Sequence, residues 1–166
     1  MKLKKEYFEI RLPKFPYYIE LSHSRRAKFK LNRRGEKTLT NPRTAGTPRF
    51  WKINGQSIYS GMHFRKRSFI VKKMKEFIQP HISNLPVLGK FPISVRLIIR
   101  DVPGKWDLDN RGWIWIKCFQ DCLVAQKKIT DDAVGFINDT GRLTFIPVKN
   151  PENRLMTFVI KSPNII

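Results

Sequence analysis

The chain has 166 residues and 41% of them are hydrophobic, which fits one domain with a substantial core and argues against wholesale disorder. Its 33 Lys and Arg residues against 13 Asp and Glu give a formal net charge of +20. We therefore expect an acidic partner, with nucleic acid favoured over an anionic membrane surface or a charge that serves only solubility.

The first 60 residues predict extended structure followed by a basic loop. Residues 6–20 are rich in aromatic and aliphatic residues, and Pro13 and Pro16 interrupt any regular strand. Residues 22–60 mix cations with Gly, Pro, Asn and Thr, which is typical of a loop or flap. The cations expected to bind DNA there are Arg25, Arg26, Lys28, Lys30, Arg33 and Arg34. Phe50 and Trp51 would either stack on bases or pin the loop to the core.

A helix is predicted over residues 62–79. Ile70, Met74, Phe77 and Ile78 recur at helical spacing, and Pro80 is expected to stop the helix. Cations lie mostly off this stripe, on a face that would either follow phosphates or be simply solvated. Those assigned to DNA binding are Arg65, Lys66, Arg67, Lys72 and Lys73, and Arg111 further along the chain is assigned to it as well.

The C-terminal half alternates strands and a helix. Residues 91–100 predict a strand, 101–108 a loop and 110–125 a second helix. Residues 133–137 and 142–148 flank Asn-Asp-Thr-Gly at 138–141, which predicts a hairpin, and 154–161 predict a last strand. No linker separates two domains, so one domain over 1–166 is expected. No apolar run is long enough to cross a membrane and no secretory signal is present, so we expect a cytoplasmic location.

The only two cysteines, Cys118 and Cys122, lie four residues apart in the second helix. Neither has a further Cys or His at the spacing of zinc ligands. They are expected to be buried free thiols in a reducing compartment.

Six of the seven aspartates lie between residues 107 and 139. Carboxylates repel phosphate unless a bound divalent cation reverses the interaction, and Mg²⁺ prefers oxygen ligands. An extended backbone would place Asp107 and Asp109 on the same side, and one of Asp131 and Asp132 would join them. Asp139 fits a turn. Asp121 fits a solvated or supporting position. Each motif alone also has a purely structural interpretation, a helix cap or a turn.

Three motifs together form a family pattern: Asp107-Leu108-Asp109-Asn110, Lys117-x-x-x-Asp121-x-Leu123 and Asp131-Asp132. Over about residues 92–140 their order resembles the RusA-type Holliday junction resolvases, which are crossover junction endodeoxyribonucleases. The resemblance implies a small α/β fold of the α+β type, with a mixed sheet and two main helices. It further implies a homodimer that nicks four-way DNA junctions with Mg²⁺, for which Mn²⁺ is an expected substitute.

The resemblance also assigns residues. It makes Asp107, Asp109 and Asp132 the metal-binding and catalytic carboxylates, and Lys117 a catalytic or phosphate-contacting lysine. The supporting residues are Asp131 and Asn110. The expected setting is bacterial or phage DNA recombination or repair. The alternatives are a non-catalytic nucleic-acid-binding protein and a metal nuclease with another branched DNA or RNA substrate.

One departure from the family pattern concerns Lys117. About four extra residues precede it, within 111–116. They would either add one helical turn, moving Lys117 about 6 Å along the axis and letting Arg111 substitute for it, or lie before a helix that starts after Gly112. In the same stretch, Trp113 and Trp115 would face DNA or, more often for such residues, pack in the core or a dimer contact.

Overall fold

The computed structural model describes residues 7–21, 24–41, 43–89, 91–103 and 108–162. The chain divides into two compact units. The first unit comprises Met1–Phe15 and Asn54–Ile166, and the second comprises Pro16–Ile53. The prediction of one nuclease domain over 1–166 remains a prediction.

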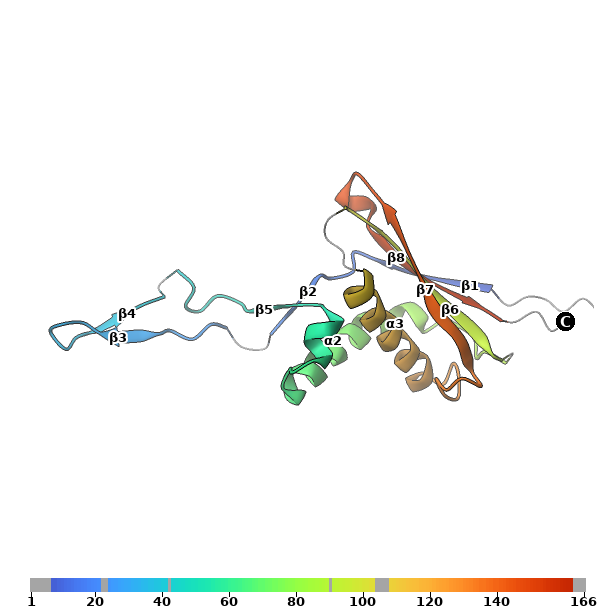
Figure 1. Ribbon diagram of the computed structural model, residues 1–166, viewed down its shortest axis with the longest axis horizontal. Helices are drawn as coiled ribbons and strands as arrows, with labels where there is room; N and C mark the ends of the chain where they lie inside the picture. The colour runs from blue at the N-terminus through green and yellow to red at the C-terminus, as the bar shows by residue number, and fades with distance from the viewer. Residues whose placement is uncertain (1–6, 22–23, 42, 90, 104–107, 163–166) are drawn as a thin grey trace, which may run out of the picture. The chain divides into compact units, whose positions relative to one another are not determined.

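A four-stranded mixed sheet forms the centre of the first unit (Figure 1). Its strands are β1 (Tyr7–Pro13), β8 (Leu155–Lys161), β6 (Ile93–Asp101) and β7 (Ile137–Pro147), in that order. β6 and β7 pair in parallel, whereas β8 is antiparallel to both β1 and β6. A parallel pair needs a long crossover, which α3 (Leu108–Ala125) supplies.

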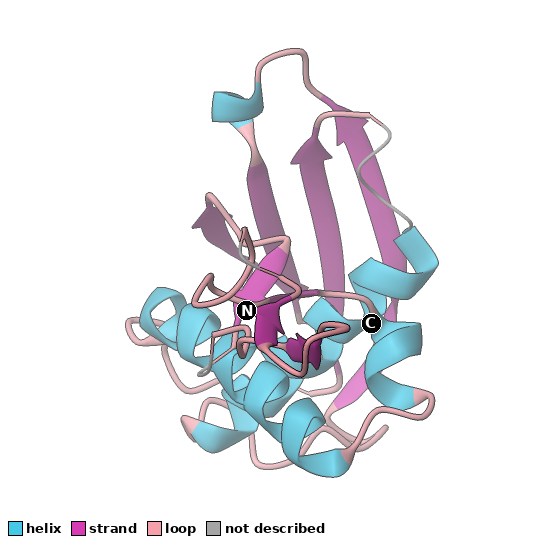
Figure 2. Ribbon diagram, turned by 90° about the vertical axis from the view of Figure 1, so that its left-hand side faces the viewer, coloured by secondary structure: helices cyan, strands magenta, loops and turns pink. Residues whose placement is uncertain are grey.

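Three helices accompany the sheet: α1 (Gly55–Tyr59), α2 (Phe64–Ile82) and α3. A short 3-10 turn, η1 (Pro151–Asn153), precedes β8. α2 packs on α3, while α3 contacts β6 and β7 and α2 contacts β1. In Figure 2 the strands of the sheet extend beyond the helices that pack on them. None of the helices in the described ranges is long and apolar enough to cross a membrane.

The core lies between the helices and one face of the sheet. β6 alternates strictly, with Val95, Leu97 and Ile99 buried, as a half-covered strand requires. Leu97 is paired with Phe158 of β8, whose ring stacks on Phe119 of α3 with centroids 4.0 Å apart. The predicted apolar stripe of α2 is likewise buried at Ile70, Met74 and Ile78. The α+β class, the mixed sheet and the two main helices are thus confirmed.

Two local predictions were wrong. Pro80 lies inside α2, which continues to Ile82, because a proline this near the helix end disturbs only the last turn. Residues 138–141 form no hairpin turn; they lie within β7, and the turn is made earlier, where the Phe136 amide donates to the Ala133 carbonyl. Pairing with β6 overrides the turn preference of residues 138–141. The β6–β7 pair accommodates this segment with register shifts on both sides of Ser94.

The second unit contains two small antiparallel pairs. β2 (Tyr18–Glu20) pairs with β5 (Phe50–Lys52), and β3 (Phe29–Leu31) pairs with β4 (Lys37–Leu39). Much of the segment expected to be a loop is therefore extended and hydrogen-bonded.

Candidate functional site

Four charged side chains from three segments meet on the first unit. Lys117 and Asp121 come from α3, Lys75 from α2, and Asp132 from the segment between α3 and β7. Lys117 Nζ lies 2.5 Å from Asp132 Oδ2 and 3.0 Å from Asp121 Oδ1. Lys75 Nζ lies 2.7 Å from the other oxygen of Asp121, Oδ2. We call these four residues the Lys117 cluster.

The apolar side of α3 explains why these polar groups stand where they do. Trp115, Cys118, Phe119 and Cys122 are buried, which leaves Lys117 and Asp121, four residues apart, as neighbours on the opposite side. The Lys117 side chain is 51% exposed and that of Asp121 is 26% exposed. The cluster is therefore accessible to a solute from water.

Asp132 is held by its own neighbour as well as by Lys117. The Asp132 amide donates to Asp131 Oδ1 at 2.7 Å. Through this hydrogen bond the exposed Asp131 supports the backbone at Asp132. The expectation that only one of the two adjacent aspartates points into the site agrees with this arrangement, since Asp132 alone pairs with Lys117 in the described contacts.

The ion pairs keep Lys117, Lys75 and Asp132 charged at neutral pH. The hydrogen bond with Asp132 raises the pKa of Lys117, despite partial burial, and that with Asp121 adds to the rise. Lys117 in turn lowers the pKa of Asp132. Burial acts to lower the pKa of Lys75, but the hydrogen bond and charge of Asp121 outweigh it, so this pKa is also raised. Two cations and two anions leave the cluster nearly neutral.

Tyr59 of α1 stands at the border of the cluster. Burial raises the pKa of its hydroxyl, and the nearby Cys118 and Asp121 add to that rise. α1 approaches the start of α3 closely, because a Cβ on Gly55 would lie 2.7 Å from the Asn110 carbonyl oxygen. Only glycine permits this approach. Neither Lys75 nor Tyr59 was singled out from the sequence, since contacts between helices leave no local signal.

The two other predicted metal ligands lie at the start of α3. Asp107 lies outside the described residues. Asp109 belongs to the first turn of α3, but the description covers its backbone only. Among the side chains that are described, no group of three or more His, Cys, Asp or Glu is placed to hold a metal ion. The metal site thus remains a prediction, of which the structure describes Asp132.

The stretch before Lys117 that departs from the resolvase-like pattern is helical throughout, so the helix does not start after Gly112. α3 begins at Leu108 and continues through Gly112, where a Cβ would lie 2.8 Å from Leu143 of β7. Lys117 therefore follows Asp109 by eight helical residues, which corresponds to about 12 Å of axial rise. Arg111, the proposed substitute for Lys117 and itself one of the cations assigned to DNA, is buried at 6% exposure.

The remaining predictions on α3 are resolved by burial. Trp115 packs in the core, edge-on to both Phe15 and Phe77, whereas Trp113 is 45% exposed. Cys118 and Cys122 are buried free thiols, as expected. Burial raises the pKa of Cys118 to about 12 and that of Cys122 to about 11, so both are protonated and unreactive at neutral pH.

The predicted DNA-binding cations occupy both units. Those of the second unit are all exposed: Arg25, Arg26, Lys28, Lys30, Arg33 and Arg34. On α2, Arg65, Lys66, Lys72 and Lys73 are exposed and Arg67 is half-buried. Lys73 donates to Glu76 at 2.7 Å and Lys72 lies 4.0 Å from it, so part of the positive charge on α2 is compensated.

No protein-family model matches the chain, and no curated protein matches it.

Proposed function

We propose that the chain is a Mg²⁺-dependent, structure-selective endodeoxyribonuclease that resolves four-way DNA junctions by paired nicks. One observation supports this most: Lys117 and Asp132, which belong to two separate motifs of the resolvase-like pattern, are in direct contact. The second motif's Asp121 is bonded to the same lysine. A nucleic-acid binder with a charge of +20 gains no affinity by gathering carboxylates near a cationic surface.

The donor set fits a hard divalent cation. Asp107, Asp109 and Asp132 would hold Mg²⁺ through carboxylate oxygens, the ligands it prefers. When bound, Mg²⁺ supplies Lewis-acid activation of the phosphodiester. The lowered pKa of Asp132 keeps its carboxylate ionised at any physiological pH, as a ligand must be.

Lys117 contributes as a cation in this proposal. A lysine whose pKa is raised stays protonated, so it donates hydrogen bonds and does not remove protons. Its partly exposed ammonium can stabilise the negative charge that develops on a phosphate oxygen next to Asp132. Asp121 and Lys75 hold it in place.

A homodimer would match the substrate. A four-way junction has approximate two-fold symmetry, and two symmetry-related sites can nick opposing strands. The cations predicted to bind DNA, those of the second unit and of α2, would bind the arms, with an affinity that falls steeply as salt rises.

The test is a nicking assay on a synthetic four-way junction with Mg²⁺. Asp107→Asn and Asp132→Asn should bind the junction and fail to nick it, whereas Glu152→Gln, which removes an exposed acid at η1, should nick at the wild-type rate. Wild-type nicking by Asp107→Asn would end the proposal. Parallel assays on flap, duplex and RNA substrates distinguish a metal nuclease with another preference.

A second candidate is a nucleic-acid-binding protein without catalysis. The second unit favours it, because ten Lys and Arg residues face only two Glu between residues 16 and 53. Such a protein would bind DNA equally well with Mg²⁺ and with EDTA at matched ionic strength, and no substrate would be cut.

A further inference from the structure

The second unit carries a strong excess of positive charge in few residues. Its ten Lys and Arg against two Glu give a net charge of +8 over Pro16–Ile53. One of the acids, Glu36, accepts a hydrogen bond from Asn32 at the β3–β4 turn. A unit of this composition attracts polyanions.

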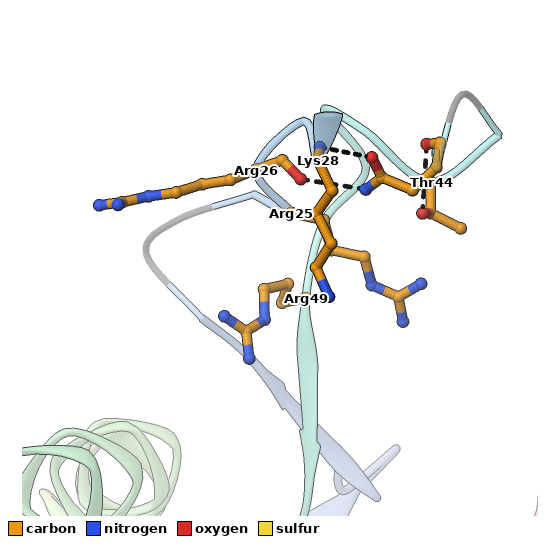
Figure 3. Close-up of a pocket in the computed structure, with 6 residues that line it drawn as sticks. Arg25, Arg26, Lys28, Thr44 and Arg49 are labelled. Carbon is orange, nitrogen blue, oxygen red and sulfur yellow. Dashed lines mark hydrogen bonds between the residues drawn. The ribbon is translucent and has the colours of Figure 1, made fainter. Parts of the chain in front are cut away.

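Part of this charge lines a pocket (Figure 3). Its lining residues are Arg25, Arg26, Lys28, Asn41, Thr44 and Arg49. None of the six is acidic. Figure 3 shows Arg26 extending away from the other basic side chains. Guanidinium groups bind phosphate oxygens in a planar, bidentate manner, so the chemistry of the pocket suits a phosphodiester.

The backbone around the pocket is fixed by hydrogen bonds. Lys28 N–H donates to the Asn41 side chain at 2.7 Å, and the Asn41 amide donates to the Arg26 carbonyl at 3.0 Å. Gly46, with φ of 76°, donates its N–H to the Arg25 carbonyl at 2.8 Å. The cations are therefore anchored on an ordered backbone, which lowers the entropic cost of binding.

The β3–β4 ribbon next in the chain exposes an apolar face. Phe29 lies directly opposite Leu39, and Leu31 is on the same face because strand side chains alternate. These three side chains are 60%, 38% and 66% exposed respectively. Lys30 and Thr38 form the other face. Exposed apolar side chains beside a cationic pocket indicate an interaction surface.

We propose that the second unit binds DNA at a branch point, with the pocket holding backbone phosphates and Phe29, Leu31 and Leu39 contacting bases whose faces are exposed there. DNA presents charged phosphates and apolar base faces within one nucleotide, and aromatic side chains stack on such faces. Three apolar side chains are a small area for membrane insertion, which scales with apolar surface. The choice of branched DNA rests on the proposed function.

The pocket is tested by binding in EDTA, where no strand is cut. Arg25→Gln/Lys28→Gln should weaken binding to a four-way junction and to a duplex by a similar factor, roughly 10-fold. The slope of log affinity against log salt concentration should become shallower by the equivalent of about one to two phosphate contacts. Lys127→Gln/Lys149→Gln removes the same charge from exposed positions of the first unit and should change affinity less than about 2-fold. If both double variants lost the same amount of DNA affinity, the proposed role of the pocket in binding phosphates would be overturned.

The ribbon is tested by selectivity. Phe29→Ser/Leu31→Ser should lower junction affinity about 10-fold and leave duplex affinity unchanged, since base faces are accessible only at the branch. Leu39→Ser tests the same face independently, and Thr38→Ala tests the opposite face and should have no effect. Equal losses on junction and duplex would overturn the role of the ribbon.

Two further arms separate this inference from its rivals. Vesicles of phosphatidylcholine with phosphatidylserine should not compete with the junction. If the protein bound vesicles, and the ribbon and pocket variants abolished that binding while DNA binding stayed intact, the surface would be assigned to lipid and the inference overturned. Nicking by Asp107→Asn, measured beside the binding series, is the second arm. If Asp107→Asn still nicks while the binding pattern holds, the proposed catalysis fails and the binding inference survives.

Discussion

The Lys117 cluster and the pocket of the second unit use positive charge in opposite ways. In the cluster, two lysines are paired with two aspartates at 2.5–3.0 Å, and the charges cancel locally. In the pocket, four of the six described lining residues are cations and none of the six is acidic. Paired charges fix geometry and produce little field outside, whereas a group of like charges attracts a polyanion from a distance. The first arrangement suits chemistry on a bound phosphate, and the second suits capture.

The largest effect should come from Asp132→Asn. Loss of this carboxylate removes a predicted ligand and leaves Lys117 without its closest partner, so nicking should fall on the order of 1000-fold. DNA affinity in EDTA should not fall, because a negative charge has been removed. A parallel loss of affinity would show that the cluster also captures DNA and would remove the contrast between the two regions.

Lys117→Met should reduce nicking about 100-fold at saturating junction. It removes the ammonium and keeps the length of the side chain. If Lys117 acts as a cation, Lys117→Arg should recover much of the rate, and the dependence of binding on salt should change little. A variant that nicks normally would reduce Lys117 to a structural role.

Lys75→Met should have a smaller effect, about 10-fold on nicking, since Lys75 acts through Asp121 on the position of Lys117. A positioning role predicts that Lys75→Arg restores the rate, and that the loss appears in kcat with KM unchanged. A loss in KM alone would place Lys75 among the residues that bind DNA.

The smallest effect should be on stability as a function of pH. The pKa of Asp132 is lowered from its ordinary value of 3.8, so its ion pair stabilises the fold above that value and is lost as pH falls through the lower, folded-state pKa. Lys117 is half exposed, and screening limits the contribution to about 0.5 kcal/mol. Urea unfolding of wild type and Asp132→Asn should differ at pH 6, and the difference should shrink as pH falls below 3.8.

Strong periodicity made the core of the first unit predictable. The buried stripe of α2 and the alternation in β6 are local patterns that the tertiary structure keeps. β7 was missed because Asn138 to Gly141 satisfy local turn preferences, which a parallel partner overrides. β3 and β4 of the second unit were missed because Gly, Pro and Asn in that segment favour a loop and hide three-residue strands.

The site was predictable only where a motif spans it. The resemblance to the resolvase pattern implied that Lys117 and Asp132 belong to one site, and the two side chains are in contact. Asp121, expected to be solvated or supporting, bridges Lys117 and Lys75. Lys75 and Asp121 are 46 positions apart in the chain and lie on different helices, so no local sequence pattern predicts that they form an ion pair. That the stretch before Lys117 is helical throughout required the observed start of α3 at Leu108.

The two thiols on the buried side of α3, below the Lys117 cluster, can report when the contact between α2 and α3 opens. Cys122 Sγ lies 3.8 Å from the Lys75 carbonyl, at the seam between α2 and α3, and Cys118 is fully buried one turn earlier. An alkylating reagent can reach these sulfurs only when α2 and α3 separate. The labelling rate therefore measures how often the contact between these helices opens. Junction DNA that engages the Lys117 cluster should slow this labelling, whereas DNA held by the second unit alone should leave it unchanged.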